Sequence, residues 1–295
     1  MEIGGTYPML YAFFDEAGRL RRDAVTRQIE AAVAAGSSGI AVLGLGSEVH
    51  KLGRDERRSL VEWTIADVGG RVPVAVTVAD GNIPDMIDSA RFARAAGAAW
   101  LILQPPRPPA SPAHLIDFFG AVADAVDCPI AIQNAPEFLG IGLSADDLLA
   151  LNAAHRNVTI VKAESSALLV ASVVDKLAGR MRVLNGRAGL ELLDNFRAGV
   201  DGMIPGTETI DLQVEIERSM RAGDERRAET LYQKLLPVIA FAMQGLGTFL
   251  LYGKVIAAAR LGLAPSHDRV PHETATPTGL TWARRYAAEL GPLPV

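Results

Sequence analysis

Eight short apolar runs recur along the first 204 residues at intervals of roughly 20 to 30 residues, and this spacing constrains the fold most. The segments between them carry apolar residues three and four positions apart, which is the spacing of one helix face. Strands that alternate with helices form a parallel sheet with right-handed crossovers. Eight units predict a closed (β/α)8 barrel, or TIM barrel. The runs are Tyr7–Phe13, Gly39–Leu43, Val72–Val78, Ala99–Leu103, Pro129–Ile132, Val158–Val161, Met181–Leu184 and Gly202–Ile204.

An open doubly wound α/β sheet is the alternative architecture. Such sheets often carry a Gly-x-Gly-x-x-Gly turn after the first strand. No such motif follows the run at Tyr7–Phe13, so the barrel is preferred.

The pattern changes after the eighth run. Residues 224–243, 247–261 and 277–290 have helical spacing with no strand between them, and Ala264–Pro277 is interpreted as an ordered linker. We therefore expect a barrel over residues 1–222. Residues 223–295 should form a C-terminal helical extension that packs on the barrel or on a partner subunit.

Composition and charge limit the classes of partner. A hydrophobic fraction of 49% with 6% aromatic residues indicates a core of alanine, leucine, valine and isoleucine. A net charge of −5 gives no basic footprint for nucleic acid. No uncharged apolar run approaches the roughly 18 residues of a membrane span, and no signal-peptide pattern is visible. We expect a cytoplasmic protein that binds a small molecule, with no nucleic-acid or membrane partner.

One apolar run ends in a lysine. Lys162 closes the run at Val158–Val161, and Glu164 follows two residues later, on the same side of the pleat. A desolvated lysine can act as an amine nucleophile and form a Schiff base with a ketone. Alternatively, the lysine stem packs and its head reaches solvent at the strand end. This stretch alone leaves both interpretations open.

Active sites of such barrels lie at the C-terminal ends of the strands. The loop after the second run, Gly44–His50, combines glycines with Ser47, and glycine lets backbone N–H groups approach an anion such as a carboxylate. Each glycine could equally serve a tight turn. Gln133, after the fifth run, and Gly206-Thr207, after the eighth, complete the set of candidate substrate-binding residues.

The sequence gives no sign of a metal or cofactor. The five histidines do not fall at paired ligand spacing, and no carboxylate cluster accompanies them. His50 is the one histidine near the inferred mouth, and we interpret it as a structural residue. The lone cysteine, Cys128, has no evident histidine partner, so acyl transfer finds little support.

Several segments resemble the pyruvate-type class I aldolases, the family of dihydrodipicolinate synthase and N-acetylneuraminate lyase. The matching segments are Ala35–Ile40 leading into Gly44–Glu48, Gly70–Val74, Arg91–Ala98 and Pro129–Pro136. The resemblance covers nearly the whole chain and implies that Lys162 forms a Schiff base with a 2-keto acid. It also implies a homo-oligomer, a tetramer or a dimer.

The departures from the family pattern narrow the range of reactions that we expect. The family's Thr-Thr pair is Leu45-Gly46, its fifth-strand tyrosine is Gln133, and its Pro-Tyr-Tyr is Pro105-Pro106-Arg107. Glutamine cannot transfer a proton near neutral pH, so the synthase itself is not expected. The Gln133–Pro136 segment and the Lys-x-Glu ending are more similar to the L-2-keto-3-deoxyarabonate dehydratase branch, in which Glu164 would transfer protons.

We therefore expect a lyase that dehydrates a 2-keto-3-deoxy sugar acid. Lys162 and Glu164 would be catalytic, and the substrate carboxylate would bind Ser47 and the amides from Gly46 to Glu48. A pyruvate-dependent aldolase is the alternative, and a non-catalytic barrel that binds a 2-keto acid is the second.

Overall fold

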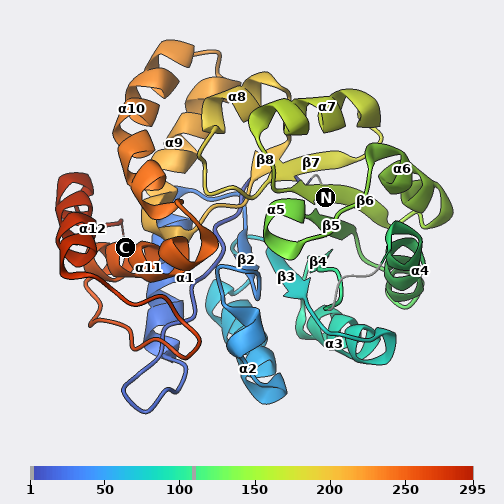
Figure 1. Cartoon of the computed structure of the whole chain (residues 1–295), viewed down its shortest axis with the longest axis horizontal. Helices are drawn as coiled ribbons and strands as arrows, with labels where there is room; N and C mark the ends of the chain where they lie inside the picture. The colour runs from blue at the N-terminus through green and yellow to red at the C-terminus, as the bar shows by residue number, and fades with distance from the viewer. Residues whose placement is uncertain (1–2, 108–110, 295) are drawn as a thin grey trace.

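The computed structural model describes residues 3–107 and 111–294 and confirms the (β/α)8 barrel (Figure 1). Its eight strands are parallel and neighbour one another in the order β1-β8-β7-β6-β5-β4-β3-β2. Met9 closes the ring, because it forms parallel bridges with Ala41 on one side and with Gly206 on the other. The strands are β1 (Gly5–Thr6), β2 (Ile40–Val42), β3 (Val74–Val78), β4 (Trp100–Leu103), β5 (Ile130–Asn134), β6 (Val158–Ala163), β7 (Arg182–Asn185) and β8 (Gly202–Met203).

Alternate side chains of the strands fill the barrel interior. Trp100 meets Tyr7 edge to face at a centroid distance of 5.3 Å. Ile160 of β6 belongs to the same inward cluster, whereas Val161 packs outward under the helices. Because side chains alternate along a strand, residue 162 must face inward as well. The strand's apolar pattern therefore fixes the direction of the lysine.

Helices surround the ring (Figure 1). Several end or begin at residues that favour helix termini: Gly36 and Gly97 take the left-handed conformation at helix C-termini, and Ser144 and Asp147 form a capping box. The helices up to the eighth unit are α1 (Arg22–Ala35), α2 (Arg54–Val68), α3 (Ile83–Ala96), α4 (Pro112–Ala123), α5 (Pro136–Leu139), α6 (Ala145–Ala154), α7 (Ala167–Leu177), α8 (Leu192–Arg197) and α9 (Ile210–Arg221), with short 3₁₀ turns η1 (Val49–Lys51) and η2 (Thr207–Thr209).

The first strand differs from the expectation of Tyr7–Phe13. Regular pairing covers Gly5–Thr6, and beyond it only Met9 bridges its neighbours. Pro8 has no N–H to donate, so the ladder is interrupted there. Phe13, the last residue of the predicted run, is buried where the chain has already left the sheet.

The chain after α9 is helical, as expected, with α10 (Glu225–Ala242), α11 (Leu246–Leu261) and α12 (Pro277–Leu290). Two α11 side chains reach the loops at the barrel mouth. Lys254 donates to Glu48 at 2.7 Å, and Arg260 donates to the main-chain oxygen of Glu208 at 2.7 Å. The boundary at residue 222 stays a prediction. Among the described residues, no helix combines the length and apolar character needed to cross a membrane.

Candidate active site

Lys162 lies inside the barrel near the C-terminal end of β6. Lys162 is 3% exposed and Glu164 is 2% exposed. The amine of Lys162 forms an ion pair with the carboxylate of Glu164. Both charges are thus withdrawn from water. A buried ion pair repays its desolvation only when further hydrogen bonds support it, so the groups around the pair decide its stability.

Gln133 supplies that support from the neighbouring strand. It stands opposite Lys162 in the β5–β6 register, and its Nε2 donates to the two carboxylate oxygens of Glu164 at 3.2 and 3.3 Å. The main-chain N–H of Glu164 donates to the carbonyl oxygen of Asn134 at 2.9 Å. The carboxylate is therefore held at a fixed place beside the amine.

Gly186, the first residue after β7, makes room for the pair. A β-carbon at this position would lie 2.6 Å from Cε of Lys162 and 2.5 Å from Oε1 of Glu164. Real contacts are never this short, so any side chain here would displace the pair.

A small cavity of about 30 Å³ lies over the pair and can hold about one water molecule. Helices α5 and α11 provide its apolar cover, with Phe138 from the former and Leu246 and Phe249 from the latter. This cover keeps bulk water from the amine. The remaining lining residues are Met9, Leu45, Gly46, Lys162, Glu164, Gly186, Ala188, Ile204, Pro205, Gly206 and Met243.

Gly46 and Gly206 line this cavity, but the Ser47 hydroxyl is used elsewhere. It is fully buried, donates to the carbonyl oxygen of Leu10 at 2.5 Å and accepts from the N–H of Leu43 at 3.0 Å. These bonds fold the loop back onto the segment that follows β1. A carboxylate-binding role for the Ser47 side chain stays a prediction, and it would require these bonds to be exchanged.

The side chains of Glu48 and Thr207 also point away from the amine. Glu48 pairs with Lys51 and Lys254, and it lines a separate cavity of about 340 Å³ that includes His50. Thr207 donates to Gln28 at 3.0 Å. The structure thus brings together Lys162, Glu164, Gln133, Gly46 and Gly206, and it separates the side chains of Ser47, Glu48 and Thr207 from them.

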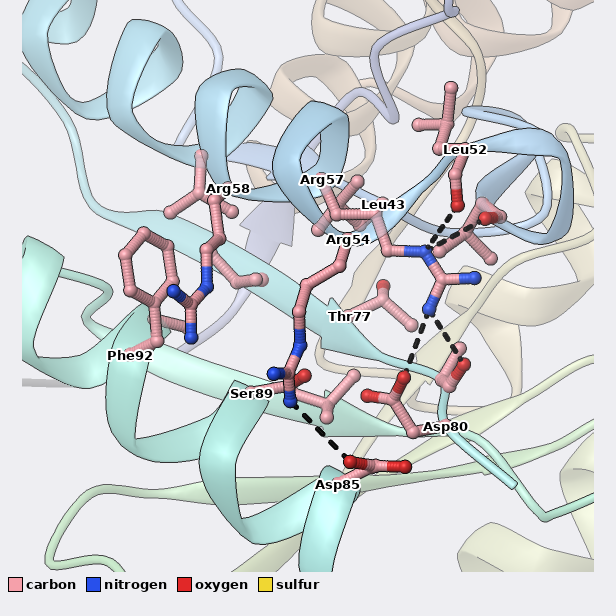
Figure 2. A pocket seen from close by; sticks show the side chains of 16 residues that line it. Leu43, Leu52, Arg54, Arg57, Arg58, Thr77, Asp80, Asp85, Ser89 and Phe92 are labelled. Atoms are coloured by element: carbon pink, nitrogen blue, oxygen red, sulfur yellow. Dashed lines mark hydrogen bonds and ion pairs between the residues drawn. The ribbon is translucent and has the colours of Figure 1, made fainter. Parts of the chain in front are cut away.

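A cavity of about 300 Å³ lies outside the barrel between α2 and α3 (Figure 2). Its arginines are already occupied. Arg57 donates to Asp80 at 3.1 Å and to main-chain oxygens of both adjacent loops, and Arg54 pairs with Asp85. Arg58 stacks over Phe92 at 4.7 Å. This cluster joins the loops after β2 and β3 and is separate from Lys162.

Tyr11 and Glu208 form a second buried pair, which no sequence motif indicates. The Tyr11 hydroxyl donates to Oε2 of Glu208 at 2.8 Å, and both residues are fully buried. A β-carbon at Gly206 would lie 2.1 Å from that carboxylate oxygen and 2.6 Å from the hydroxyl. The pair therefore occupies the space where a side chain of residue 206 would stand, next to the lysine cavity.

Burial governs the ionisation of this pair. It raises the pKa of Glu208 to about 7, although the hydrogen bond from Tyr11 opposes the shift. Burial also holds the pKa of Tyr11 well above its ordinary value, and the charge of Glu208 adds to this effect. Glu208 is thus a carboxyl group that titrates near neutral pH.

The comparison with protein families agrees with this geometry. A model described as "Dihydrodipicolinate synthetase family" matches residues 2–276. The chain belongs to this family. Members of the family are class I lyases, and the chain is accordingly a lyase of the Schiff-base aldolase type.

Named relatives of the dihydrodipicolinate synthetase family span more than one reaction. The chain is 32% identical over 238 residues to a 4-hydroxy-tetrahydrodipicolinate synthase of Agrobacterium fabrum, covering 79% of this chain and 81% of that protein. It is 30% identical over 249 residues to L-2-keto-3-deoxyarabonate dehydratase of Azospirillum brasilense, covering 80% and 78%.

A solved structure extends the similarity to the whole fold. YagE of Escherichia coli K12, determined in complex with pyruvate, superposes with a TM-score of 0.90 at 25% identity, covering 97% of this chain and 98% of that one.

In the part of the chain that the structure describes, no group of three histidine, cysteine, aspartate or glutamate residues is placed to hold a metal ion.

The raised pKa of Glu208 predicts how stability depends on pH. Between about pH 4.5 and 7 the folded protein holds a proton on Glu208 that the unfolded chain has released. The free energy of unfolding should therefore fall by about 3 kcal/mol as pH rises through this range. Glu208→Gln should remove this part of the pH dependence, as measured by urea unfolding from pH 4.5 to 8.

The exposed Glu16 provides the control, because Glu16→Gln should follow the wild-type curve. A Glu208→Gln protein whose stability changes with pH as the wild type's does would show that Glu208 ionises normally.

Proposed function

We propose that Lys162 forms a Schiff base with a 2-keto acid, and that the enzyme dehydrates a 2-keto-3-deoxy sugar acid. The observation that carries this proposal is the buried ion pair of Lys162 with Glu164, held by Gln133 where the family pattern has a tyrosine. The pair places one amine and one proton-transfer group side by side inside the barrel. The dehydratase of Azospirillum brasilense among the relatives supports the same reaction.

The ion pair explains how the amine becomes a nucleophile. Proton transfer from the Lys162 ammonium to Glu164 leaves a neutral amine beside a neutral carboxylic acid. The amine attacks the C2 carbonyl of the keto acid, and Glu164 returns its proton to the departing hydroxyl, which leaves as water. The products are a protonated imine and a carboxylate, so charge and protons balance.

Dehydration then uses the same carboxylate. The protonated imine withdraws electrons from C3, and Glu164 removes a C3 proton as general base, which gives an enamine. The enamine expels the C4 hydroxyl, which takes the proton from Glu164 and leaves as a second water. Hydrolysis of the remaining imine releases the product. Cleavage of the C3–C4 bond in place of hydroxyl loss is the aldolase alternative.

The substrate carboxylate is proposed to lie at the loop after β2. The N–H groups of Ser47 and Glu48 donate to the carbonyl oxygens of Gly44 and Leu45 within the loop. The amide of Gly46, which lines the cavity, is therefore our preferred donor. Ser47 would act by fixing the shape of this loop.

Self-association is part of the proposal. Leu168 and Leu169 in the first turn of α7 are 86% and 57% exposed, which is unusual for two adjacent large apolar side chains. We propose that a second copy of the chain covers them in a homo-oligomer, a dimer or a tetramer.

Replacement of the nucleophile tests the Schiff base. Lys162→Ala should abolish the adduct that borohydride traps with pyruvate, as measured by intact-protein mass. Lys176→Ala removes an exposed lysine and Lys254→Ala a buried one, and both should still be trapped. An undiminished pyruvate adduct on the Lys162→Ala protein would exclude this lysine.

Replacement of the base separates binding from chemistry. Glu164→Gln should form the imine more slowly, because Glu164 no longer takes the Lys162 proton, but should still reach it at equilibrium. Loss of the general base should slow C3 proton exchange and dehydration by about 10²–10⁴-fold. NMR measures C3 proton exchange as deuterium incorporation at C3. Assays with a panel of 2-keto-3-deoxy sugar acids measure the rate of dehydration.

The wild-type products decide between the reactions. Water loss without pyruvate release supports the dehydratase, whereas release of pyruvate and an aldehyde would establish the aldolase. Wild-type exchange rates in Glu164→Gln would remove Glu164 from the mechanism.

Charges on the exposed leucines test the assembly. The double variant Leu168→Asp/Leu169→Asp should sediment as a smaller species than the wild type, because charged groups oppose burial at an interface. Val270→Asp, at another exposed apolar side chain, should leave the assembly intact. A wild-type protein that sediments as a single 31.3 kDa chain would contradict the proposal.

A further inference from the structure

Two buried glutamines stand next to each other on the inner wall of the barrel. Gln104 directly follows β4, and Gln133 lies on β5; they are 4% and 2% exposed. Leu103 pairs with Ile132 in the β4–β5 register, so Gln104 is level with Gln133, and Gln133 pairs with Lys162. Alternation along the strands turns all three side chains inward. They form a row across three strands that ends at the reactive amine.

Each glutamine carries a buried polar atom without a hydrogen-bond partner among the described residues. On Gln104 this atom is the amide nitrogen Nε2, and on Gln133 it is the amide oxygen Oε1. The orientation of the Gln133 amide is fixed chemically, because the Glu164 carboxylate accepts from its nitrogen. Its oxygen is therefore left for another group.

One unpaired atom is a donor and the other an acceptor, which together match the hydrogen-bonding character of a single hydroxyl group. A hydroxyl donates one hydrogen bond and accepts others. Its proton would satisfy Oε1 of Gln133, and its oxygen would accept from Nε2 of Gln104. A buried polar atom without a partner is costly, and this cost makes such a site reject ligands that lack the matching group.

We propose that Gln104 and Gln133 bind the C4 hydroxyl of the 2-keto acid and so select hydroxylated substrates. This inference rests on the proposed function, in which C2 of the acid is bonded to Lys162. Glu164 then lies at C3, and Gln133 holds Glu164 from the side that faces Gln104 along the row. The next carbon of the substrate is directed towards the two amides.

The role follows from the chemistry of the amide. A neutral amide neither gives up nor takes a proton near neutral pH, so Gln104 does not replace Glu164. It orients the hydroxyl and donates a hydrogen bond to its oxygen. In a dehydration this oxygen departs as water, and the same contact would hold it close to the acid form of Glu164.

A pair of simple 2-keto acids tests the inference. 4-Hydroxy-2-oxopentanoate and 2-oxopentanoate differ only in the C4 hydroxyl, and borohydride traps the imine of either on the intact protein. We expect the half-saturating concentration for trapping to be about tenfold lower for the hydroxylated acid, the effect of about one net hydrogen bond. Mass spectrometry identifies the trapped acid.

The variant Gln104→Met keeps the length of the side chain and removes the amide. It should trap 2-oxopentanoate as the wild type does and lose the preference for the hydroxylated acid. Gln213→Met is the matched control, because Gln213 on α9 is also a buried glutamine with an unpaired oxygen. It should retain the preference.

The outcomes separate the two proposals. A wild-type protein that traps neither acid contradicts the Schiff-base function itself. Trapping of both acids without a preference, or a preference that survives Gln104→Met, contradicts the hydroxyl site alone. If Gln104→Met traps neither acid, Gln104→Leu is measured, and it should trap 2-oxopentanoate but not prefer the hydroxylated acid, because leucine forms no hydrogen bond. Equal loss of both acids in both variants would make Gln104 a structural residue and overturn the inference.

Discussion

The ion pair between Lys162 and Glu164 is the interaction on which the rest of the site depends. An apolar barrel interior is a poor place for two opposite charges, since both lose their hydration. The surroundings are built to tolerate the pair: Gln133 donates to the carboxylate, and Gly186 leaves the space that the two side chains fill. In the proposed mechanism, proton exchange between the two partners starts the reaction.

The C-terminal helices shape the mouth of the barrel over this pair. Leu246 and Phe249 at the start of α11 cover the lysine cavity, and Lys254 and Arg260 further along the same helix hold the loops after β2 and β8. Helix α11 therefore both covers part of the cavity and binds the loops beside it. A substrate larger than the 30 Å³ cavity requires side chains of its lining to move.

Sequence periodicity was sufficient to predict the barrel, because eight alternating strand and helix segments leave a local pattern. It also placed Lys162 and Glu164 on the same side of one strand, because side chains alternate along a strand. It was insufficient where the outcome depends on contacts distant in the chain. The Ser47 hydroxyl bonds to Leu10, and Tyr11 meets Glu208 across 197 positions of sequence. Neither contact leaves a local pattern. Gly46 and Gly206 line the lysine cavity, but the directions of the side chains that follow them could not be predicted without the fold.

The central claim is that one lysine among five carries the reaction, and peptide mapping of the wild-type protein tests it directly. After reduction with borohydride in the presence of pyruvate, the protein is digested and each lysine-containing peptide is examined for the adduct. Lys51 and Lys254 are also largely buried and ion-paired, so they are stringent internal comparisons. The account predicts the adduct on Lys162 and on no other lysine. An adduct on Lys254 or Lys51, or no adduct at all, would contradict it.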